Sequence, residues 1–451
     1  ERFRIDSSGN VKVGSACTIS PDGDVFFTGV CTATTLAGSG ANLTALPAAN
    51  LTGALPAISG ANLTGIAATD NVRTGILDVA GIATFRDTVN VPNINGGQIG
   101  GRRNLIINGA MQVAQRGTSS TSDTYATVDR FYKFHNGTDE SPTQAQADVS
   151  SGTTPYTNGF RKAFKITNGN QTSGAGAGDV IEIVTKLEAQ DMAQCGWNYT
   201  STSSFVTLSF WVKSSVAQNF YGQLTTTDGT SQNYPFETGS LSADTWTKIT
   251  KTIPGNSNLQ FDNDNELGLT IKWIMFRGTN TTDSGVTLNA WAAFSSSTRT
   301  PDNTSTWYTT NDATFEITGV QLEVGSQATA FEHRSFGEER LLCQRYYQDI
   351  AGSSDLVMWG SGRASTSSVA LVNTPLSVPL RASPTISQTS YTTWGTAGSH
   401  SVDNETPTVQ YFHANNTFLP MQFHSTSSLT NARVATVACR DGSSLVMDAE
   451  L

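Results

Sequence analysis

Within residues 317–350, ITGVQLEVGSQATAFEHRSFGEERLLCQRYYQDI, the sequence pattern changes from that of a strand to that of a helix. Apolar and polar residues alternate as far as Gly325, a period that predicts a closing strand. Ser335 and Glu338 then have the S-x-x-E spacing of a capping box, in which each side chain binds a backbone N–H of the other residue. The pattern therefore predicts a strand followed by a connecting helix over residues 335–350, which ends near Gln348.

This helix needs a packing partner, because an isolated helix of about 14 residues is only marginally stable in water. Phe336, Cys343 and Ile350 are seven residues apart, and Tyr346 and Tyr347 lie beside them. Such spacing suits a seam between copies of the chain. It equally suits a helix docked on its own domain, and both interpretations stay open.

The composition indicates strands and turns. Only 14% of the 451 residues are charged, against about 25% in an average soluble protein. The net charge of −10 argues against a nucleic-acid partner, because phosphate binding requires clustered Lys and Arg. No apolar run approaches the roughly 18 residues of a membrane span, so no membrane insertion is expected. The sequence contains no motif for a cofactor, and none is expected.

The first 40 residues contain a repeat. The pattern Ile-x-x-x-Gly that begins at Ile5 returns fourteen residues later at Ile19. Each copy predicts a strand, a glycine turn and a second strand. Cys17 and Cys31 occupy equivalent positions, and we expect two free thiols because stacked repeats bury small apolar side chains at such positions.

Residues 41–100 are of low complexity, with the tetrapeptide Ala-Asn-Leu-Thr repeated among prolines and glycines. One interpretation is a linker without structure. The other is a narrow shaft in which three chains bury regularly spaced leucines along a common axis. These leucines are Leu43, Leu46, Leu51 and Leu55.

Three predicted strands of the middle region each place an aromatic residue on their polar face. In residues 205–213, 220–224 and 288–294 alternate residues face opposite sides, and the apolar set is expected inside. The other set combines rings, which stack on the C–H faces of sugars, with amide and ammonium groups that bind hydroxyls. The candidate glycan-binding residues are Trp211, Lys213, Tyr221, Gln223, Asn289 and Trp291. A subunit interface and a loop-covered core are the alternatives for this face.

Two strings carry a resemblance to a known family. Residues 104–132 contain NLIINGAMQVAQRGTS and DRFY, and residues 321–348 read QLEVGSQATAFEHRSFGEERLLCQRYYQ. Their order and spacing resemble the middle part of tail-fibre proteins of tailed bacteriophages, marine ones especially. In that family the strings mark the two ends of a β-sandwich similar to carbohydrate-binding modules. The resemblance extends over about residues 102–348.

The resemblance implies an all-β, homotrimeric fibre. The expected parts are a β-repeat shaft over residues 1–40, a trimeric shaft and hinge over 41–100, a jelly-roll β-sandwich over 101–334, the connecting helix, and a C-terminal β-sandwich tip over 351–451. The chain begins with Glu1 rather than Met, so a missing N-terminal part is expected. The family implies a partner in a phage tail or baseplate adaptor protein, and a place on the virion after assembly in the host cytoplasm.

The resemblance also implies a function: non-enzymatic adsorption to a polysaccharide or lipopolysaccharide of the host surface. One alternative is a tailspike enzyme that degrades polysaccharide, which would require a long parallel β-helix. Another is a purely structural rod. No catalytic residues are assigned, because glycosidase chemistry needs two carboxylates across a sugar and the aromatic face has no acidic residue.

The C-terminal tip is a rival receptor site, because the distal loops of such fibres usually contact the host. Its candidate residues are Trp359, Trp394, His400 and His413. The segment RDGS at residues 440–443 predicts a hairpin turn between the last two strands.

One acidic segment is a candidate for structural calcium, which carbohydrate modules often hold. It contains Asp262, Asp264 and Glu266. Gly268 falls at the seventh position of this segment, whereas an EF-hand loop requires glycine at the sixth. No other metal site is expected.

Overall fold

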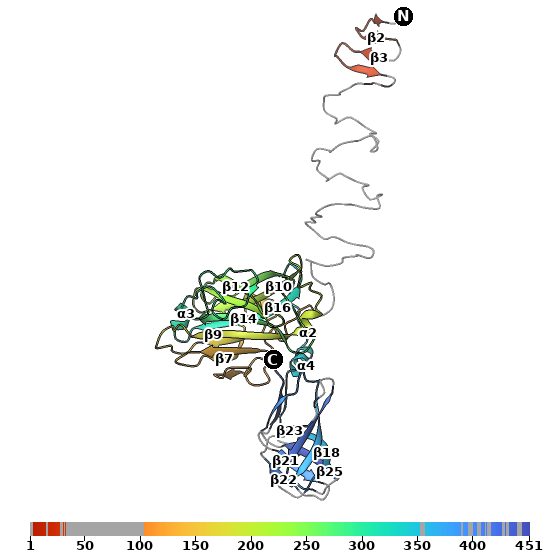
Figure 1. Cartoon of the computed structure of the whole chain (residues 1–451). Coiled ribbons are helices and arrows are strands. Elements are labelled where there is room, and N and C mark those ends of the chain that lie inside the picture. Colours follow the sequence, from red (N-terminus) through yellow and green to blue (C-terminus); the bar gives the residue numbers. More distant parts are fainter. Residues whose placement is uncertain are drawn as a thin grey trace. The chain divides into compact units, whose positions relative to one another are not determined.

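The computed structural model divides the chain into two units, residues 1–86 and residues 87–451 (Figure 1). The structure describes residues 3–14, 17–27, 30, 32, 103–351, 357–388, 391–395, 400–403, 407–410, 412, 416–425, 429, 433–439 and 444–451, with the backbone alone at 351, 391–395, 400–403 and 439. The predicted leucine shaft and Cys31 lie outside these residues. The fold of the described chain is all-β, as predicted, with short helices.

The N-terminal unit contains an antiparallel meander of four strands. They are β1 (Arg4–Ile5), β2 (Val11–Val13), β3 (Cys17–Ile19) and β4 (Val25–Phe27), hydrogen-bonded in that order. Gly9 and Gly23 occupy equivalent turns at φ of 81° and 91°, a conformation that glycine adopts without strain. The predicted repeat of strand, glycine turn and strand is confirmed, and Cys17 is a free thiol.

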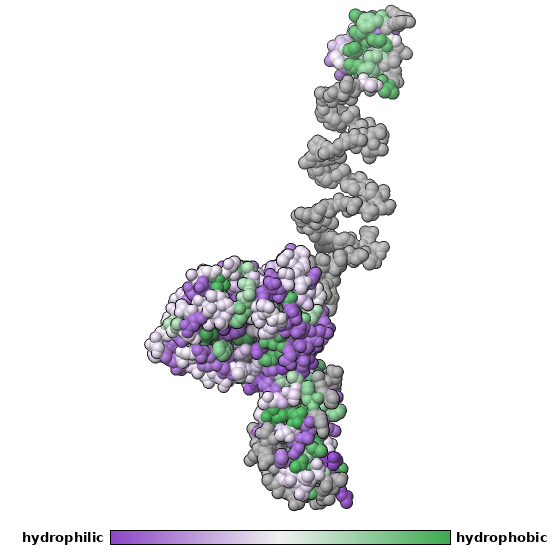
Figure 2. Space-filling model, in the orientation of Figure 1, coloured by the Kyte–Doolittle hydropathy of each residue, from purple (hydrophilic) through white to green (hydrophobic). Residues whose placement is uncertain are grey.

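One face of this meander is apolar from edge to edge. Ile5 pairs with Val11, Val11 with Ile19, and Ile19 with Val25, so the four side chains form one row across the sheet. None of the side chains described in residues 3–32 is buried, and Figure 2 shows apolar residues gathered on the surface of this unit. The described meander therefore has no core of its own.

Residues 103–334 form a sandwich of two six-stranded antiparallel sheets, labelled in Figure 1. The sheet that we call the β10 sheet has the order β13 (Thr247–Pro254), β10 (Phe205–Ser214), β16 (Thr314–Val324), β8 (Lys162–Thr167), β7 (Thr143–Asp148) and β5 (Ser119–Ser120). The β11 sheet has the order β15 (Ala292–Ala293), β12 (Gln232–Ser240), β11 (Asn219–Thr226), β14 (Leu267–Arg277), β9 (Val180–Glu188) and β6 (Phe131–Asn136).

The apolar faces of the two sheets meet in one core. Val206, Leu208, Phe210 and Val212 of β10 point inward and are fully buried, as the alternation predicts. From the opposite sheet, Trp273 of β14 packs edge-on against Phe210, with ring centroids 5.6 Å apart. Burial of each such side chain is worth about 1.5–3 kcal/mol, so this core holds the two sheets together.

The two strings that carry the family resemblance lie side by side. The backbone N–H of Leu105 donates to the carbonyl of Leu322 at 2.9 Å. The buried amide of Asn104 donates to the carbonyl of Val320 at 3.1 Å and accepts from the N–H of Leu322 at 3.1 Å. The start of the sandwich is thus hydrogen-bonded directly to its last strand, β16.

The described helices are short. They are α1 (Thr154–Thr157), α2 (Ala189–Ala193), α3 (Thr306–Thr309) and α4 (Phe336–Gln344). None of them has the length and apolar character that crossing a membrane requires.

Helix α4 begins with the predicted capping box. The N–H of Glu338 donates to Ser335 Oγ at 3.3 Å, and the N–H of Ser335 donates to Glu338 Oε2 at 2.9 Å. The expectation that the helix reaches Gln348 is wrong, since the chain forms strand β17 (Tyr347–Ala351) instead. Tyrosine and isoleucine in this segment favour an extended strand once a neighbouring strand is available.

One side of α4 docks on its own chain. Cys343 is fully buried in a small cluster with Ile107, Val113 and Tyr346. Phe336, the first residue of the predicted seam, is 54% exposed. The docked interpretation therefore holds for Cys343.

The C-terminal region contains two further antiparallel sheets. The three-stranded sheet has the order β17, β26 (Ser444–Asp448) and β20 (Thr385–Gln388). The seven-stranded sheet has the order β22 (His400–Asp403), β21 (Tyr391–Gly395), β25 (Val434–Cys439), β18 (Val357–Ala364), β19 (Val369–Pro375), β24 (Phe418–His424) and β23 (Thr408–Val409). The predicted hairpin turn at residues 440–443 lies outside the described residues, and the strands on either side of it, β25 and β26, belong to different sheets.

The last residues after β26 return to the sandwich and meet two buried arginines. The guanidinium of Arg130, which is 2% exposed, pairs with Glu450 and stacks on the ring of Tyr346 at 3.4 Å. The guanidinium of Arg116 lies 3.2 Å from Glu450 and 3.6 Å from Asp129. The two cations thus share Glu450, and Asp129 and Asp448 add negative charge beside Arg116.

We expect Glu450→Ala to lower the free energy of unfolding by about 3–5 kcal/mol, because it leaves buried guanidinium groups without their shared partner. Urea denaturation followed by tryptophan fluorescence measures this change. The matched control is Glu266→Ala, which removes a carboxylate whose side chain is 72% exposed and 3.9 Å from Arg381. The control should cost at most about 1 kcal/mol. Equal losses in the two variants would contradict the role of Glu450.

Candidate functional site

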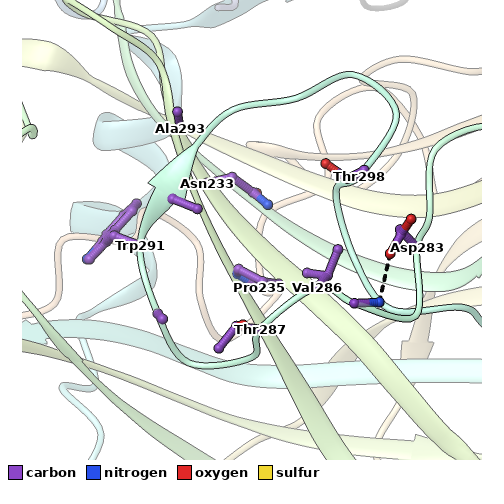
Figure 3. Close-up of a pocket in the computed structure, with 11 residues that line it drawn as sticks. Asn233, Pro235, Asp283, Val286, Thr287, Trp291, Ala293 and Thr298 are labelled. Carbon is purple, nitrogen blue, oxygen red and sulfur yellow. Dashed lines mark hydrogen bonds between the residues drawn. The ribbon is translucent and has the colours of Figure 1, made fainter.

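A pocket of about 510 Å³ lies beside strand β12 of the β11 sheet (Figure 3). Its size falls within the range of ordinary ligand pockets. The lining residues come from β12 and from the loop before and after β15: Asn233, Pro235, Asp283, Gly285, Val286, Thr287, Ala290, Trp291, Ala292, Ala293 and Thr298. We call it the Trp291 pocket.

Hydrogen bonds to β12 hold the loop in place. Residues Ala292 and Ala293 pair with Asn233 and Gln232 as a two-residue strand. The N–H of Asn289 donates to the carbonyl of Pro235 at 2.8 Å. Asn289 itself has φ of 57°, which asparagine tolerates better than most residues. The loop is therefore anchored on both sides of the indole that it carries.

Trp291 is fixed on the wall of the pocket. Its indole N–H donates to the carbonyl of Pro254, at the end of β13, at 2.7 Å. Its ring packs against Tyr234, with centroids 5.2 Å apart. Burial raises the pKa of Tyr234 to about 12, so that hydroxyl stays neutral. Trp291 thus spans from the edge of one sheet to the other and presents a ring that is already ordered.

Polar groups line the rest of the pocket (Figure 3). Asn233, only 3% exposed, donates from Nδ2 to the carbonyl of Arg299 at 2.8 Å. Its Oδ1 has no hydrogen-bond partner among the described residues. Thr287 and Thr298 supply hydroxyls, and Asp283 supplies a carboxylate that accepts from the N–H of Gly285 at 2.7 Å.

The chemistry of this wall suits the binding of a sugar. An ordered ring can stack on the C–H face of a sugar while threonine and backbone groups bind its hydroxyls. Hydrolysis of a glycosidic bond needs two carboxylates, and Asp283 is the only acidic residue among the described lining residues. No lysine or arginine belongs to that lining either.

The structure does not bring together the six candidate glycan-binding residues, which we call the predicted platform. Trp211 and Lys213 lie on β10, whereas Tyr221 and Gln223 lie on β11. These consecutive strands belong to opposite sheets, so their outward sides face away from each other across the core. The single aromatic face over the three strands is therefore wrong.

On the β10 sheet, the outward side is covered by the protein itself. Trp211 is half-buried in a small apolar cluster with Phe160, Phe331 and Trp246. Lys213 lies over the ring of Trp246 at 5.2 Å and pairs with Glu316 at 3.0 Å. The loop-covered alternative applies to this part of the predicted platform.

On the β11 sheet, Gln223 belongs to a buried ionic network. Its Oε1 accepts from Arg277 at 2.6 Å, and Arg277 pairs with Glu182 at 2.5 Å. Lys272 binds the other oxygen of Glu182. Burial alone raises the pKa of Glu182, but the two cations outweigh it and hold that pKa below its ordinary value. Gln223 is 1% exposed and faces protein rather than ligand.

The three remaining residues of the predicted platform are Tyr221, Asn289 and Trp291. Tyr221 is half-buried, and burial together with Glu237 raises its pKa. The expected strand over residues 288–294 shrinks to Ala292–Ala293, so Asn289 and Trp291 stand on a loop. Of the six residues, Trp291 lines the pocket. Asn233, Asp283, Thr287 and Thr298 were missed, because no spacing along the chain links β12 to this loop.

The rival tip residues are only partly described. Trp359 is fully buried in the C-terminal core and donates to the carbonyl of Ile350 at 3.2 Å, so its prediction as an exposed contact is wrong. The backbone pairs Trp394 with His400 on neighbouring strands β21 and β22. His413 lies outside the described residues.

The calcium candidate has no metal geometry. The N–H of Asp262 donates to Asp228 at 3.0 Å, and the N–H of Glu266 donates to Asp264 at 3.0 Å. Glu266 also lies 3.9 Å from Arg381. Within the part of the chain that the structure describes, no three His, Cys, Asp or Glu side chains form a group that could hold a metal ion.

No protein-family model and no curated protein matches the chain. Among solved structures, it is similar to the enzymatically active domain of bacteriophage CBA120 tailspike protein 4, with 10% identity, a TM-score of 0.27, and coverage of 49% of this chain and 21% of that chain. It is similar to a CBM4 structure with 13% identity, a TM-score of 0.25, and coverage of 48% and 97%. The tandem CBM22 domains of Paenibacillus barcinonensis Xyn10C show 7% identity, a TM-score of 0.25, and coverage of 79% and 98%.

The ionic network of Glu182, Arg277 and Lys272 predicts that the folded protein becomes less stable in acid. In the folded protein the pKa of Glu182 lies below its ordinary value of 4.5. The carboxylate therefore adds to the free energy of unfolding above that value, and this contribution is lost as the pH falls through the folded pKa. We expect Glu182→Gln to cost about 3 kcal/mol at neutral pH, and this difference should shrink under acid.

Urea unfolding between neutral and acidic pH measures the difference. Asp148→Asn, at an ion pair whose carboxylate is 83% exposed, is the control and should differ little at any pH. A difference for Glu182→Gln that is constant with pH would contradict the assignment.

Proposed function

We propose that the chain is a non-enzymatic, homotrimeric tail fibre of a tailed phage that adsorbs to a glycan on the host surface. Its partners would be a host polysaccharide or lipopolysaccharide and a tail or baseplate adaptor protein, and its place the virion. The fibre part of the proposal rests on the resemblance of residues 104–132 and 321–348 to that family. The observation that carries glycan recognition is the pocket built around the fixed indole of Trp291.

Binding without catalysis is supported by the lining of this pocket. The ring of Trp291 is ordered before any ligand arrives, so little conformational entropy is lost on binding. A shallow site of this kind suits weak recognition. Three copies on one fibre raise the effective concentration of each site after the first has bound, so weak single sites suffice.

Trimer formation is supported by the uncovered face of the N-terminal meander. The row from Ile5 to Val25 is followed on the same face by a row in which Val13 pairs with Cys17 and Cys17 with Phe27. A large exposed apolar patch on a soluble protein marks a surface that binds another molecule. Packing of three such faces against one another would bury this surface, and one copy cannot do so within its described residues.

The meander offers a matched test of association. Ile19→Glu places a charge on the apolar face, whereas Thr18→Glu places it on the opposite face of the same strand. For the unchanged protein we expect light scattering at micromolar concentration to give about three times the chain mass of 47.9 kDa. Ile19→Glu should weaken association and Thr18→Glu should not.

A mass of one chain for the unchanged protein would contradict the trimer. Equal effects of the two glutamates would contradict the role of the meander, because only one of them disturbs the apolar face.

Two pairs of variants test the pocket. Thr287 and Ser296 are both exposed in the same loop, but only Thr287 lines the pocket. We expect Thr287→Arg to fill the pocket and reduce adsorption to host cells at least tenfold, and Ser296→Arg to leave adsorption unchanged. Trp291→Ala should act like Thr287→Arg, whereas Trp211→Ala, on the other sheet, should not. Adsorption is measured as depletion of protein by host cells, with unfolding curves as the check on folding.

The alternatives give different outcomes in the same assays. A tailspike enzyme would release reducing sugars from isolated host polysaccharide over time. A purely structural rod would adsorb to no host cells and bind no glycan. Normal adsorption by Thr287→Arg would place recognition outside the Trp291 pocket.

A further inference from the structure

A second hollow, of about 530 Å³, lies on the seven-stranded sheet of the C-terminal region. It is lined by residues of β18, β19 and β24 and by the residue after β23: Gly362, Arg363, Leu371, Val372, Asn373, Gln410, Pro420 and Met421. We call it the Arg363 hollow. None of the predicted tip residues belongs to it.

Register places four of its residues on one outward side of the sheet: Arg363, Leu371, Asn373 and Pro420. Arg363 pairs with Leu371, and Leu371 pairs with Gln422. Two residues along, Asn373 pairs with Pro420. The alternate residues of β19 are buried in the core, so this set points away from it.

Glycine brings two strands close together beneath the hollow. A Cβ added to Gly362 would lie 1.9 Å from the carbonyl oxygen of Leu371, so no side chain fits there. Gly362 pairs with Val372, whose side chain is buried, so this close approach lies on the core side of the sheet. Gln410 closes one end, where its Nε2 donates to Gln422 at 2.7 Å.

The charge of this hollow is opposite to that of the Trp291 pocket. Arg363 is exposed and has no ion-pair partner among the described residues, and no Asp or Glu is among the described lining residues. A guanidinium group binds a carboxylate with two parallel hydrogen bonds. In the Trp291 pocket the charged lining residue is Asp283, which repels anions.

The remaining groups suit a sugar ring. Leu371 and Pro420 supply apolar surface for C–H groups, and Asn373 supplies an amide that can donate to and accept from hydroxyls. We infer that the Arg363 hollow is a second saccharide site, specific for an acidic sugar whose carboxylate pairs with Arg363. This inference does not depend on the Trp291 pocket.

Calorimetric titration of the full chain with a glucuronate-containing oligosaccharide tests the inference, with a neutral gluco-oligosaccharide of equal length as reference. We expect the acidic ligand to bind at least tenfold more tightly than the neutral one. Arg363→Ala should remove this preference, and Arg363→Lys should keep part of it. Binding should weaken at high salt, because an exposed ion pair is screened.

Three controls identify the site. Arg340→Ala removes the same charge from an exposed position on α4 and should leave binding unchanged. Thr287→Arg blocks the Trp291 pocket and should also leave it unchanged. Inorganic phosphate at the same concentration should compete poorly, because it lacks the ring that contacts Leu371 and Pro420. Equal binding of the two oligosaccharides, equal effects of the two alanine variants, or full competition by phosphate would each overturn the inference.

Discussion

Each sheet of this protein has a face of apolar side chains that must be kept from water, and the rest of the structure depends on how that face is covered. In the sandwich, β10 and β14 cover each other through Phe210 and Trp273. On the outward side of the β10 sheet, loops bring Phe160 and Phe331 over Trp211. In the N-terminal meander, no described side chain covers the row from Ile5 to Val25.

Local patterns predicted much of this fold correctly. Alternation identified the inward residues of β10, the Ile-x-x-x-Gly repeat identified the N-terminal meander, and the pair Ser335 and Glu338 identified the start of α4. Each of these features depends on residues within one short stretch of the chain. The end of α4 was not predictable in the same way, because Tyr347 becomes part of a strand only through pairing with Asp448 at the far end of the chain.

Local patterns did not predict which residues meet in the candidate site. Alternation assigns the two sides of one strand, but it does not say which sheet the strand joins. Trp211 and Tyr221 were therefore placed on one surface although β10 and β11 lie in opposite sheets. Asn233 and Trp291 share a pocket only because residues 292–293 pair with β12. Trp359 was expected in an exposed loop of the tip, and it is buried because β18 lies in the middle of its sheet.

The pairing of Arg130 with Glu450 has a consequence for synthesis on the ribosome. The two residues are separated by 320 positions, and at about 5–20 residues per second the second follows the first after roughly 15–65 s. During that interval the base of the nascent sandwich carries the guanidinium group of Arg130, whose partner Glu450 has not yet been made. A chain released before residue 450 would keep this imbalance permanently. Completion of the sandwich base is thereby coupled to the synthesis of a residue 320 positions further along the chain.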